Sequence, residues 1–378
     1  MITYINIKGL YGIHNYSIDF NKMECLKIIH APNGYGKTTL LRLVKATLKG
    51  EFEVIRQIPF DSLKVTCEGN LDVTVYKKEA QLLYILNQNS EKQCYMVDDV
   101  KSEEVVILCS KLKAITEHMP IYMIGADRLW LEKEGFGDKT PTFFPTVLEY
   151  ARELGELMRE ALAKSNYAAQ ELDRSFPSRL IQKVQEDKPT LLPQDKIYDL
   201  LKELEKKRVI LECAGLFHNI NVVDLKQEKT LDDRLIKVLE IYIEDSYKKL
   251  GVFEELATKI NLLINLINKR FAHKVMEVNM NEGFVFKVPT GETLTADKLS
   301  SGEQNELILI FRLLFKSPQH ALILIDEPEI SLHIAWQQSF LEDMEAVAKL
   351  TNLKLIIATH SPDIINGRWD LTIGLEEC

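Results

Sequence analysis

Two stretches far apart in the chain carry residue types and spacings that suit phosphate chemistry. Residues 31–39 read Ala-Pro-Asn-Gly-Tyr-Gly-Lys-Thr-Thr, a glycine loop that ends in a lysine and two threonines. Residues 299–304 read Leu-Ser-Ser-Gly-Glu-Gln, and the later apolar run 321–325 is closed by the carboxylates Asp326 and Glu327. The acid pair alone could equally be the polar end of a buried strand. We call residues 299–304 the signature. The lysine loop, the signature and the acid pair together predict an ATP site.

The glycine loop has the composition that phosphate binding requires. Gly34 and Gly36 allow backbone N–H groups to turn inward around phosphate oxygens, and a helix that starts near Lys37 adds its positive end. Lys37 is expected to reach the β- and γ-phosphates and Thr38 to ligate Mg²⁺. We therefore predict that ATP is bound by these loop residues: Asn33, Gly34, Gly36, Lys37, Thr38 and Thr39.

One position of the loop departs from the phosphate-loop motif G-x-x-x-x-G-K-[ST]. Ala31 stands where the motif has its first glycine, and its methyl group fits if the residue keeps β-region dihedrals. The alternative interpretation is a glycine turn before an amphipathic helix, because apolar residues recur at helical spacing from Thr38 to Leu48.

Short apolar runs predict the strands that position these residues. Residues 26–29 lead into the glycine loop, and 321–325 lack the alternation of a strand with one solvated face. Residues 354–358 form a similar run that ends in Thr-His-Ser-Pro. Open α/β sheets bind their ligands at the carboxyl ends of parallel strands. The predicted fold class is α/β, with the site at that edge.

A further buried strand is predicted at 121–125, and Ala126, Asp127 and Arg128 follow it. Asp127 and Arg128 could approach a γ-phosphate from this strand end. Such a pair is also commonly a strand-end salt bridge, and the sequence leaves both interpretations open.

The rest of the chain changes pattern twice. Alternation predicts a hairpin-like pair at 2–7 and 16–20, and residues 52–126 are strand-like and predict a small antiparallel sheet. From about 145 to 270 the pattern is helical, without a persistent heptad, which predicts a compact insertion rather than a long coiled coil. Breaks are expected at Pro177, Pro189, Pro193 and Gly251.

Strands return after residue 271, where Asn-Glu-Gly at 281–283 is a strong hairpin signal. We predict three parts: lobe I with the phosphate loop and the antiparallel β-subdomain at 1–130, the helical insertion at 131–270, and lobe II with signature, acid pair and His360 at 271–378.

Bulk properties narrow the class of protein. The chain has 378 residues with a net charge of −9, and its six cysteines form no Cys-x-x-Cys pair. No apolar run approaches the roughly 18 residues of a membrane span, so we expect a cytoplasmic protein without a membrane partner. The charge argues against a uniformly basic nucleic-acid surface but allows a local basic groove, so any nucleic-acid binding should be weak and nucleotide-dependent.

The motifs at 31–39, 299–304 and 325–333, together with His360, resemble those of an ABC-type ATPase of the SMC/RecF/OLD group. The resemblance covers about half of the chain and implies a two-lobed nucleotide core with an inserted helical segment. The form Asp-Glu-Pro-Glu-Ile-Ser-Leu-His is closer to OLD-like phage-defence ATPases, such as those of the Septu and PARIS systems, than to RecF.

The resemblance implies a role for the motif residues of the second lobe. Asp326 would hold Mg²⁺ through water, and Glu327 would polarise the attacking water as general base. His360 would contact the γ-phosphate, and His333 would lie in the loop that crosses to the other subunit. The site of a second chain would be completed by Ser300, Ser301, Gly302 and Glu303, so ATP is expected to close a head-to-tail homodimer. The glutamine that normally ends the lobe-linking strand is replaced by Asp127 and Arg128.

The expected function is a nucleotide-switched sensor or scaffold in an anti-phage complex with a separate effector, expected to be a nuclease. Only 18 residues follow His360, and acids such as Glu186, Asp187 and Asp195 lie scattered among prolines, so we expect no nuclease site in this chain. A RecF-like ATPase of DNA repair or recombination is the alternative. A detached ATPase subunit of a transporter is the third possibility, against which the helical insertion counts.

Overall fold

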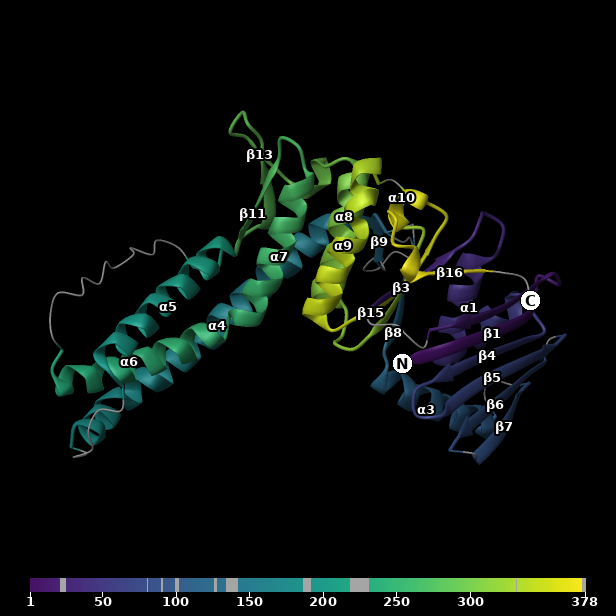
Figure 1. Cartoon of the computed structure of the whole chain (residues 1–378), viewed down its shortest axis with the longest axis horizontal. Coiled ribbons are helices and arrows are strands. Elements are labelled where there is room, and N and C mark those ends of the chain that lie inside the picture. Colours follow the sequence, from purple (N-terminus) through teal and green to yellow (C-terminus); the bar gives the residue numbers. More distant parts are fainter. Residues whose placement is uncertain are drawn as a thin grey trace. The chain divides into compact units, whose positions relative to one another are not determined.

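The computed structural model describes residues 1–20, 25–79, 81–89, 91–98, 102–125, 128–133, 142–185, 192–217, 231–330 and 332–375. Its mixed helices and sheets confirm the α/β class (Figure 1). The chain forms two compact units, Met1–Leu129 with Ser301–Cys378, and Trp130–Ser300. We call them the first and the second unit.

A parallel sheet lies in the first unit, with the strand order β16-β3-β15-β14-β8. Its strands are β3 (Leu26–His30), β8 (Ile121–Ile124), β14 (Leu322–Asp326), β15 (Lys354–Thr359) and β16 (Thr372–Gly374). Every residue of β14 is buried, as expected for a strand covered on both faces. The register pairs Asp326 with Ala358 and Thr359 with His30, so these strands end at a common edge.

The described helices of the first unit connect its strands along the chain. They are α1 (Lys37–Lys49), α2 (Phe52–Gln57), α3 (Glu103–His118), α8 (Ser301–Phe311), α9 (Ile334–Thr351) and α10 (Pro362–Ile365). A π-helical turn, Arg312–Lys316, directly continues α8. The predicted strand-to-helix passage through the glycine loop is confirmed, because β3 precedes the loop and α1 follows it.

The antiparallel sheet of the first unit has the order β2-β1-β4-β5-β6-β7 (Figure 1). Its strands are β1 (Ile2–Leu10), β2 (His14–Asp19), β4 (Ser62–Cys67), β5 (Leu71–Lys78), β6 (Gln81–Gln88) and β7 (Glu91–Val97). Alternate side chains such as Leu63 and Val65 join one hydrophobic cluster with Leu40 and Val44 of α1 and Leu324 of β14. This shared core joins the antiparallel sheet to the phosphate-loop helix.

The strand-like interpretation of 52–126 was wrong for α2 and for α3, of which α3 is the longer. Ser102 caps this helix by accepting from the N–H of Val105, and Glu103 and Glu104 fill its first turn. Val105, Leu108 and Leu112 are buried at helical spacing. The β-branched run within 105–107 resembles a strand locally, but the cap and the single buried face favour a helix.

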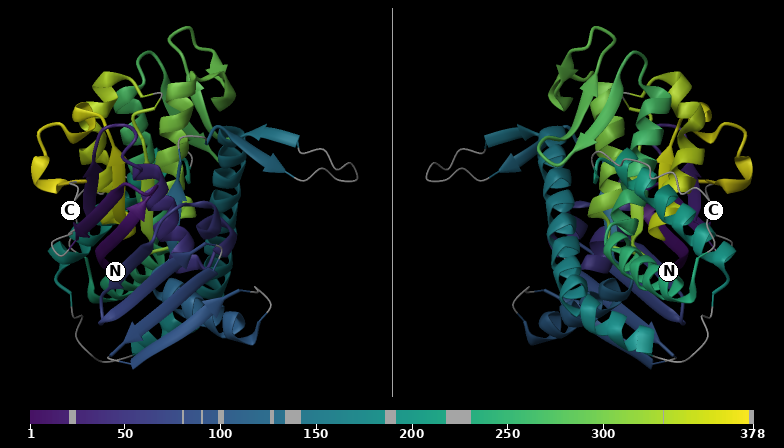
Figure 2. Two further views of the ribbon diagram at one scale, coloured as in Figure 1. Left: turned by 90° about the vertical axis from the view of Figure 1, so that its right-hand side faces the viewer. Right: turned by 90° about the vertical axis from the view of Figure 1, so that its left-hand side faces the viewer.

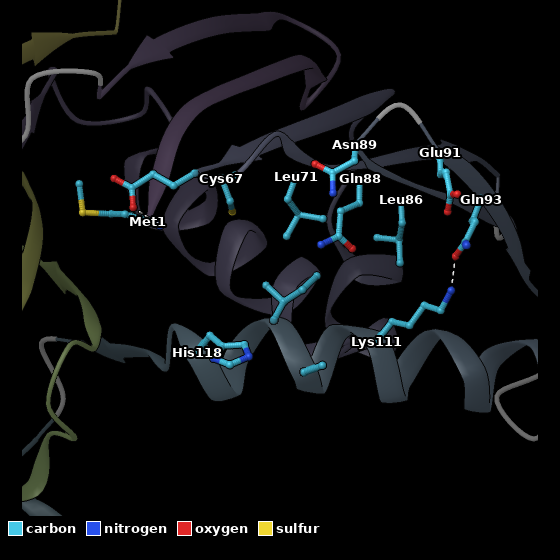
Figure 3. Close-up of a pocket in the computed structure, with 14 residues that line it drawn as sticks. Met1, Cys67, Leu71, Leu86, Gln88, Asn89, Glu91, Gln93, Lys111 and His118 are labelled. Carbon is cyan, nitrogen blue, oxygen red and sulfur yellow. Dashed lines mark hydrogen bonds and ion pairs between the residues drawn. The ribbon is translucent and has the colours of Figure 1, made fainter.

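A groove of about 760 Å³ opens between α3 and the ends of the antiparallel strands (Figure 3). Leu71, Leu86 and Ile115 are among the apolar residues that line it. At its rim Gln93 Oε1 accepts from the Tyr95 hydroxyl at 2.9 Å and from Lys111. The lining comes from Met1, α3 and the antiparallel strands and their turns, away from the strand ends of the parallel sheet.

The second unit is built around long helices. They are α4 (Thr146–Gln185), α5 (Gln194–Cys213), α6 (Asp233–Gly251) and α7 (Glu254–Arg270). Its strands are β9 (Trp130–Lys133), β10 (Thr142–Pro145), β11 (Val275–Asn279), β12 (Gly283–Lys287) and β13 (Thr293–Leu294). β9 and β10 pair as an extended hairpin before α4, and α4 and α6 pack along each other (Figure 2). In the part of the chain that is described, no helix is long and apolar enough to cross a membrane.

The predicted break at Pro177 was wrong, because α4 continues through it. Ser175 Oγ and Arg179 Nη2 both donate to the carbonyl of Leu172, at 3.1 and 2.9 Å. Arg179 also reaches Asp245 of α6 with two bonds of 2.7 Å. The bonds to Leu172 are local to α4, and the tertiary pair with Asp245 supports the helix beside Pro177, which cannot donate a backbone hydrogen bond. The breaks before Gln194 and at Gly251 are confirmed, and Pro189 lies outside the described residues.

The hairpin predicted around 281–283 is confirmed by the antiparallel pairing of β11 with β12. Gly283 has φ +75°, and a Cβ there would lie 1.7 Å from the carbonyl oxygen of Ala151 on α4, so only glycine fits this approach. The structure thereby groups β11–β13 with the helices of the second unit. The division into two units does not test the predicted boundaries of the two ATPase lobes and the insertion, so these boundaries stay predictions.

Candidate functional site

The glycine loop between β3 and α1 needs its two glycines for conformational reasons. Gly34 and Gly36 have φ of +92° and +71°, in the left-handed region. A Cβ on Gly36 would also lie 3.0 Å from Leu10 Cδ2. Gly36 is the N-cap of α1, whose first turn, Lys37-Thr38-Thr39, contains no acid. The positive end of α1 therefore faces the loop without a competing carboxylate from its own first turn.

Lys37 bends back over this loop. Its Nζ donates to the carbonyl oxygens of Ala31 at 2.7 Å and Pro32 at 3.0 Å, and the residue is only 4% exposed. Burial lowers the pKa of Lys37, while the carboxylates of Glu327, Glu329 and Asp326 oppose that shift. The ammonium group thus lies in the field of the acids that follow β14. Its predicted contact with the β- and γ-phosphates stays a prediction.

Thr38 connects the loop to β14. Its Oγ1 donates to Asp326 Oδ1 at 3.0 Å, across a sequence separation of 288 residues. Burial raises the pKa of Asp326, and the hydrogen bond from Thr38 acts in the opposite direction. A hydroxyl and a carboxylate oxygen at this distance fit the oxygen ligands that Mg²⁺ prefers, with phosphate and water for the rest of its shell.

Glu327, Glu329 and His360 meet beside this pair. Glu327 has φ +44°, and its N–H donates to Ala358 O of β15 at 2.9 Å. His360 Nδ1 lies 3.0 Å from Glu329 Oε1 and 3.8 Å from Glu327 Oε1. The sequence analysis assigned no role to Glu329. Glu329 is the second glutamate of the Asp-Glu-Pro-Glu motif, and this position could have pointed to it. The sequence analysis used that motif only to assign a subgroup of the family.

The other predicted loop residues, Asn33 and Thr39, lie toward the surface. Asn33 is exposed, and the Thr39 hydroxyl lies 2.9 Å from the Tyr11 hydroxyl. His333 is the N-cap of α9, where its Nδ1 accepts from the N–H of Ala335 at 3.2 Å. Its position in a loop that reaches a second subunit stays a prediction.

The signature residues occupy the start of α8. Ser301, Gly302 and Glu303 form its first turn, and Ser300 precedes it. Glu303 is buried, whereas Ser300 and Ser301 are exposed. Their predicted contact is with the nucleotide of another chain, and that contact stays a prediction.

Arg128 is turned into the protein at the end of β8. Its Nε donates to Asn305 Oδ1 of α8 at 3.0 Å, and both residues are buried. Burial lowers the pKa of Arg128 to about 10, and the charge of Arg312 acts in the same direction. Arg128 thus ties β8 to the helix that begins with the signature. Asp127, its predicted companion, lies outside the described residues.

Comparison with known proteins gives a family. Residues 1–365 match the family described as AAA ATPase domain. The Retron Ec83 probable ATPase of Escherichia coli is 26% identical over 168 residues, which are 36% of this chain and 31% of that protein. The chain therefore spans about a third of that curated relative.

Three solved structures are similar to this chain at low identity. The Smc head domain of Pyrococcus furiosus with an extended coiled coil, bound to the C-terminal domain of ScpA, is 13% identical with a TM-score of 0.39, over 99% of this chain and 92% of that one. The SMC head domain of Thermotoga maritima is 12% identical with a TM-score of 0.39, over 99% and 94%. An SmcHead bound to the C-winged helix domain of ScpA is 13% identical with a TM-score of 0.42, over 99% and 94%. Similarity at this level does not bear on function.

Proposed function

This chain belongs to the AAA ATPase domain family, and we propose that it binds ATP with Mg²⁺ and hydrolyses it as a nucleotide-controlled switch. The supporting observation is the meeting of Thr38 with Asp326 at 3.0 Å, beside a buried Lys37. These residues come from two strand-to-loop junctions of one parallel sheet, where open α/β sheets bind ligands. Together they offer a lysine, a hydroxyl and a carboxylate to a nucleotide phosphate and its metal.

Each residue would act on a different part of the reaction. Backbone N–H groups of the loop from Asn33 to Thr39 would hold the phosphate oxygens, and Lys37 would exchange its two loop carbonyls for the β- and γ-phosphates. Thr38 and Asp326 would hold Mg²⁺, which neutralises charge on the phosphates when bound. Glu327 would orient and deprotonate the attacking water, and His360 would contact the γ-phosphate from the end of β15.

We further propose that two chains share two sites in a head-to-tail homodimer. Ser300 to Glu303 would cap the nucleotide held by the partner's loop, and His333 would lie at the crossing between subunits. Ile330 and Ile334, which flank His333 in the chain, are 40% and 59% exposed, which suits a surface that becomes covered. The proposed output of hydrolysis is the opening and closing of this dimer.

The proposed biological setting is defence against phage, with a separate effector protein. The OLD-like form of 326–333 and the retron ATPase among the relatives support it. The experiment is affinity purification of the tagged chain from its own operon, with ATP or ADP in the buffer. A second protein retained in only one nucleotide state would support a switch, and purification of this chain alone in both states would contradict it.

Hydrolysis is tested by phosphate release from ATP with Mg²⁺. We expect Lys37→Ala to lose ATP binding and to reduce release by about 100-fold or more. Lys45→Ala is the matched control, because Lys45 lies on the same helix and pairs with Glu51 at 3.1 Å. Glu327→Gln should bind ATP, hydrolyse it very slowly, and double in mass by light scattering when ATP is added. An unchanged mass at saturating ATP would contradict the shared sites.

A further inference from the structure

The hairpin of β1 and β2 contacts the glycine loop with buried side chains. The Tyr16 hydroxyl of β2 donates to the backbone carbonyl of Tyr35 at 2.9 Å. Tyr16 is only 1% exposed, so water has little access to its hydroxyl. Leu10 at the end of β1 packs against Gly36, since a Cβ on that glycine would lie 3.0 Å from Leu10 Cδ2. The hairpin therefore holds the two loop residues that precede Lys37.

Aromatic stacking fixes Tyr35 from the same hairpin. The His14 ring stacks on the rings of Tyr16 and Tyr35, with centroids 5.5 and 5.7 Å apart and interplanar angles of 17° and 23°. His14 and Tyr16 are two residues apart on β2, so their side chains lie on the same face of the sheet, and both are buried. The ring of Tyr35 is thus held by stacking while its carbonyl is held by the Tyr16 hydroxyl.

The bond from Tyr16 decides the direction of one N–H group of the loop. The peptide between Tyr35 and Gly36 is trans, so its carbonyl and its N–H point in opposite directions. With the carbonyl turned to Tyr16, the N–H of Gly36 points away from β2. Glycine tolerates φ of either sign, so this peptide could otherwise flip. A flipped peptide would present a carbonyl oxygen where an N–H had been, and that oxygen repels a phosphate.

We propose that Tyr16 is a positioning residue for phosphate binding: its hydroxyl holds the Tyr35–Gly36 peptide with the N–H of Gly36 turned into the glycine loop. This inference rests on the proposed function, because the ligand concerned is the phosphate chain of a bound nucleotide. Gly36 is the N-cap of α1, so its N–H lies beside the positive end of that helix. The tyrosine acts through the loop backbone and does not itself contact the phosphate.

The first test observes this peptide directly and needs no nucleotide. The pair Tyr-Gly occurs twice in the sequence, at 11–12 and 35–36. A sample with ¹³C-carbonyl tyrosine and ¹⁵N-glycine therefore isolates the amide signals of Gly12 and Gly36 in a carbonyl-correlated NMR spectrum. In Tyr16→Phe, which removes only the hydroxyl, we expect the Gly36 signal to shift or to divide into two, with a smaller change at Gly12. An unchanged Gly36 signal would overturn the proposal.

Tyr84→Phe is the matched control for every measurement. The Tyr84 hydroxyl of β6 also donates to a backbone carbonyl, that of Thr47 at 3.4 Å, near the carboxyl end of α1. Tyr84 is fully buried, so both substitutions remove a buried hydroxyl and keep the ring. We expect both variants to lose a similar small amount of melting temperature and only Tyr16→Phe to lose affinity for phosphate. Equal losses of affinity would mean that the hydroxyl acts on stability alone, which would contradict the proposal.

The second test is affinity, measured by isothermal titration calorimetry. Tyr16→Phe should weaken the binding of ATP with Mg²⁺ by about 3- to 10-fold, the factor expected for the loss of one hydrogen bond. Tripolyphosphate with Mg²⁺, which lacks base and ribose, should lose affinity by the same factor. In hydrolysis assays KM for ATP should rise by this factor with kcat nearly unchanged, because the interaction that is lost holds substrate and transition state alike.

The outcomes separate this inference from the proposed function. A loss of affinity for ATP without a loss for tripolyphosphate would place the effect at the base or the ribose and would overturn the inference. If the natural chain binds both ligands and Tyr16→Phe binds them equally well, the inference alone fails. If the natural chain binds neither ligand, the proposed function fails, and the role of Tyr16 fails with it.

Discussion

The strand ends of the first unit and the helices of the second unit use charged residues in opposite ways. At the strand ends, buried charged side chains bond to neutral partners across long sequence separations, as in Asp326 with Thr38 and Arg128 with Asn305. In the second unit many ion pairs are one helical turn apart. An example is Lys248 with Glu244, in which more than half of both side chains is exposed. Buried charges cost free energy unless they are paired. The buried charges at the strand ends therefore cost the first unit free energy of folding, which a function at this site would explain. The charged side chains on the helices of the second unit are mostly solvated and carry little such cost.

The largest effect that tests this comparison is expected from Asp326→Asn. Loss of the carboxylate should lower Mg²⁺-dependent hydrolysis by at least about 100-fold, because the metal loses its charged ligand. The same change should raise the melting temperature of the nucleotide-free protein at neutral pH. Burial raises the pKa of Asp326, so the folded state binds this proton more tightly than the unfolded chain does. Stability from this group therefore falls as pH rises through the two pKa values.

Differential scanning fluorimetry without metal or nucleotide measures this gain. It should vanish below about pH 4, where the natural aspartate is itself protonated in the unfolded chain. The hydrogen bond from Thr38 can be kept, because the asparagine Oδ1 also accepts. A lower melting temperature for Asp326→Asn at pH 7 would show that Asp326 stabilises the fold. It would contradict the statement that the buried charges at the strand ends cost stability.

A smaller effect is expected where the parallel sheet meets the signature helix. Arg128→Ala removes the donor to Asn305 and leaves α8 less firmly joined to β8. We expect kcat for ATP to fall by about 10-fold, with a smaller change in KM. Asn305→Ala should have a similar effect, and the double variant should be no worse than either single one. Additive losses would mean that the two residues act separately.

The sequence predicted the strands of the site well, because each is an apolar run that ends in a recognisable polar group. The sequence analysis expected the site at the carboxyl ends of the parallel strands, but the direct hydrogen bond from Thr38 to Asp326 is a finding of the structure. Glu329 could not be found in this way, because its partners Thr359 and His360 lie 30 and 31 residues further along the chain. Glu329 comes close to Thr359 and His360 because β14 pairs with β15 in a particular register. No local sequence pattern predicts that register.

Local rules failed where tertiary contacts outweighed them. Pro177 predicts a break, yet α4 continues, and two residues further on Arg179 pairs with Asp245 of α6. The helix α3 was missed because its β-branched run is ambiguous over a few residues. The signature residues, in contrast, were recognised by type alone, and their predicted contact with a second chain needs a measurement on the dimer.

The Arg179–Asp245 pair departs from this pattern within the second unit, because Asp245 is 8% exposed and receives two bonds. Arg179→Ala should lower the free energy of unfolding by about 1.5–3 kcal/mol, since a charge-assisted pair is lost and α4 loses its support beside Pro177. Thermal unfolding of the whole chain measures the change. We expect kcat per folded molecule to stay unchanged. A loss of kcat at a temperature where the variant is fully folded would mean that the second unit takes part in hydrolysis.

The smallest effect is expected from the exposed pair Lys248–Glu244, whose side chains are 54% and 55% exposed at a separation of 2.7 Å. Such pairs one helical turn apart gain little, because solvent and salt screen the charges and both side chains lose freedom. Lys248→Ala should change the free energy of unfolding by less than about 0.5 kcal/mol, and the change should shrink further in high salt. Denaturant unfolding of this variant beside Arg179→Ala is the matched measurement. If Lys248→Ala destabilised the chain as much as Arg179→Ala does, exposure would not be what separates weak from strong ion pairs here, and the contrast drawn between the two units would lose its physical basis.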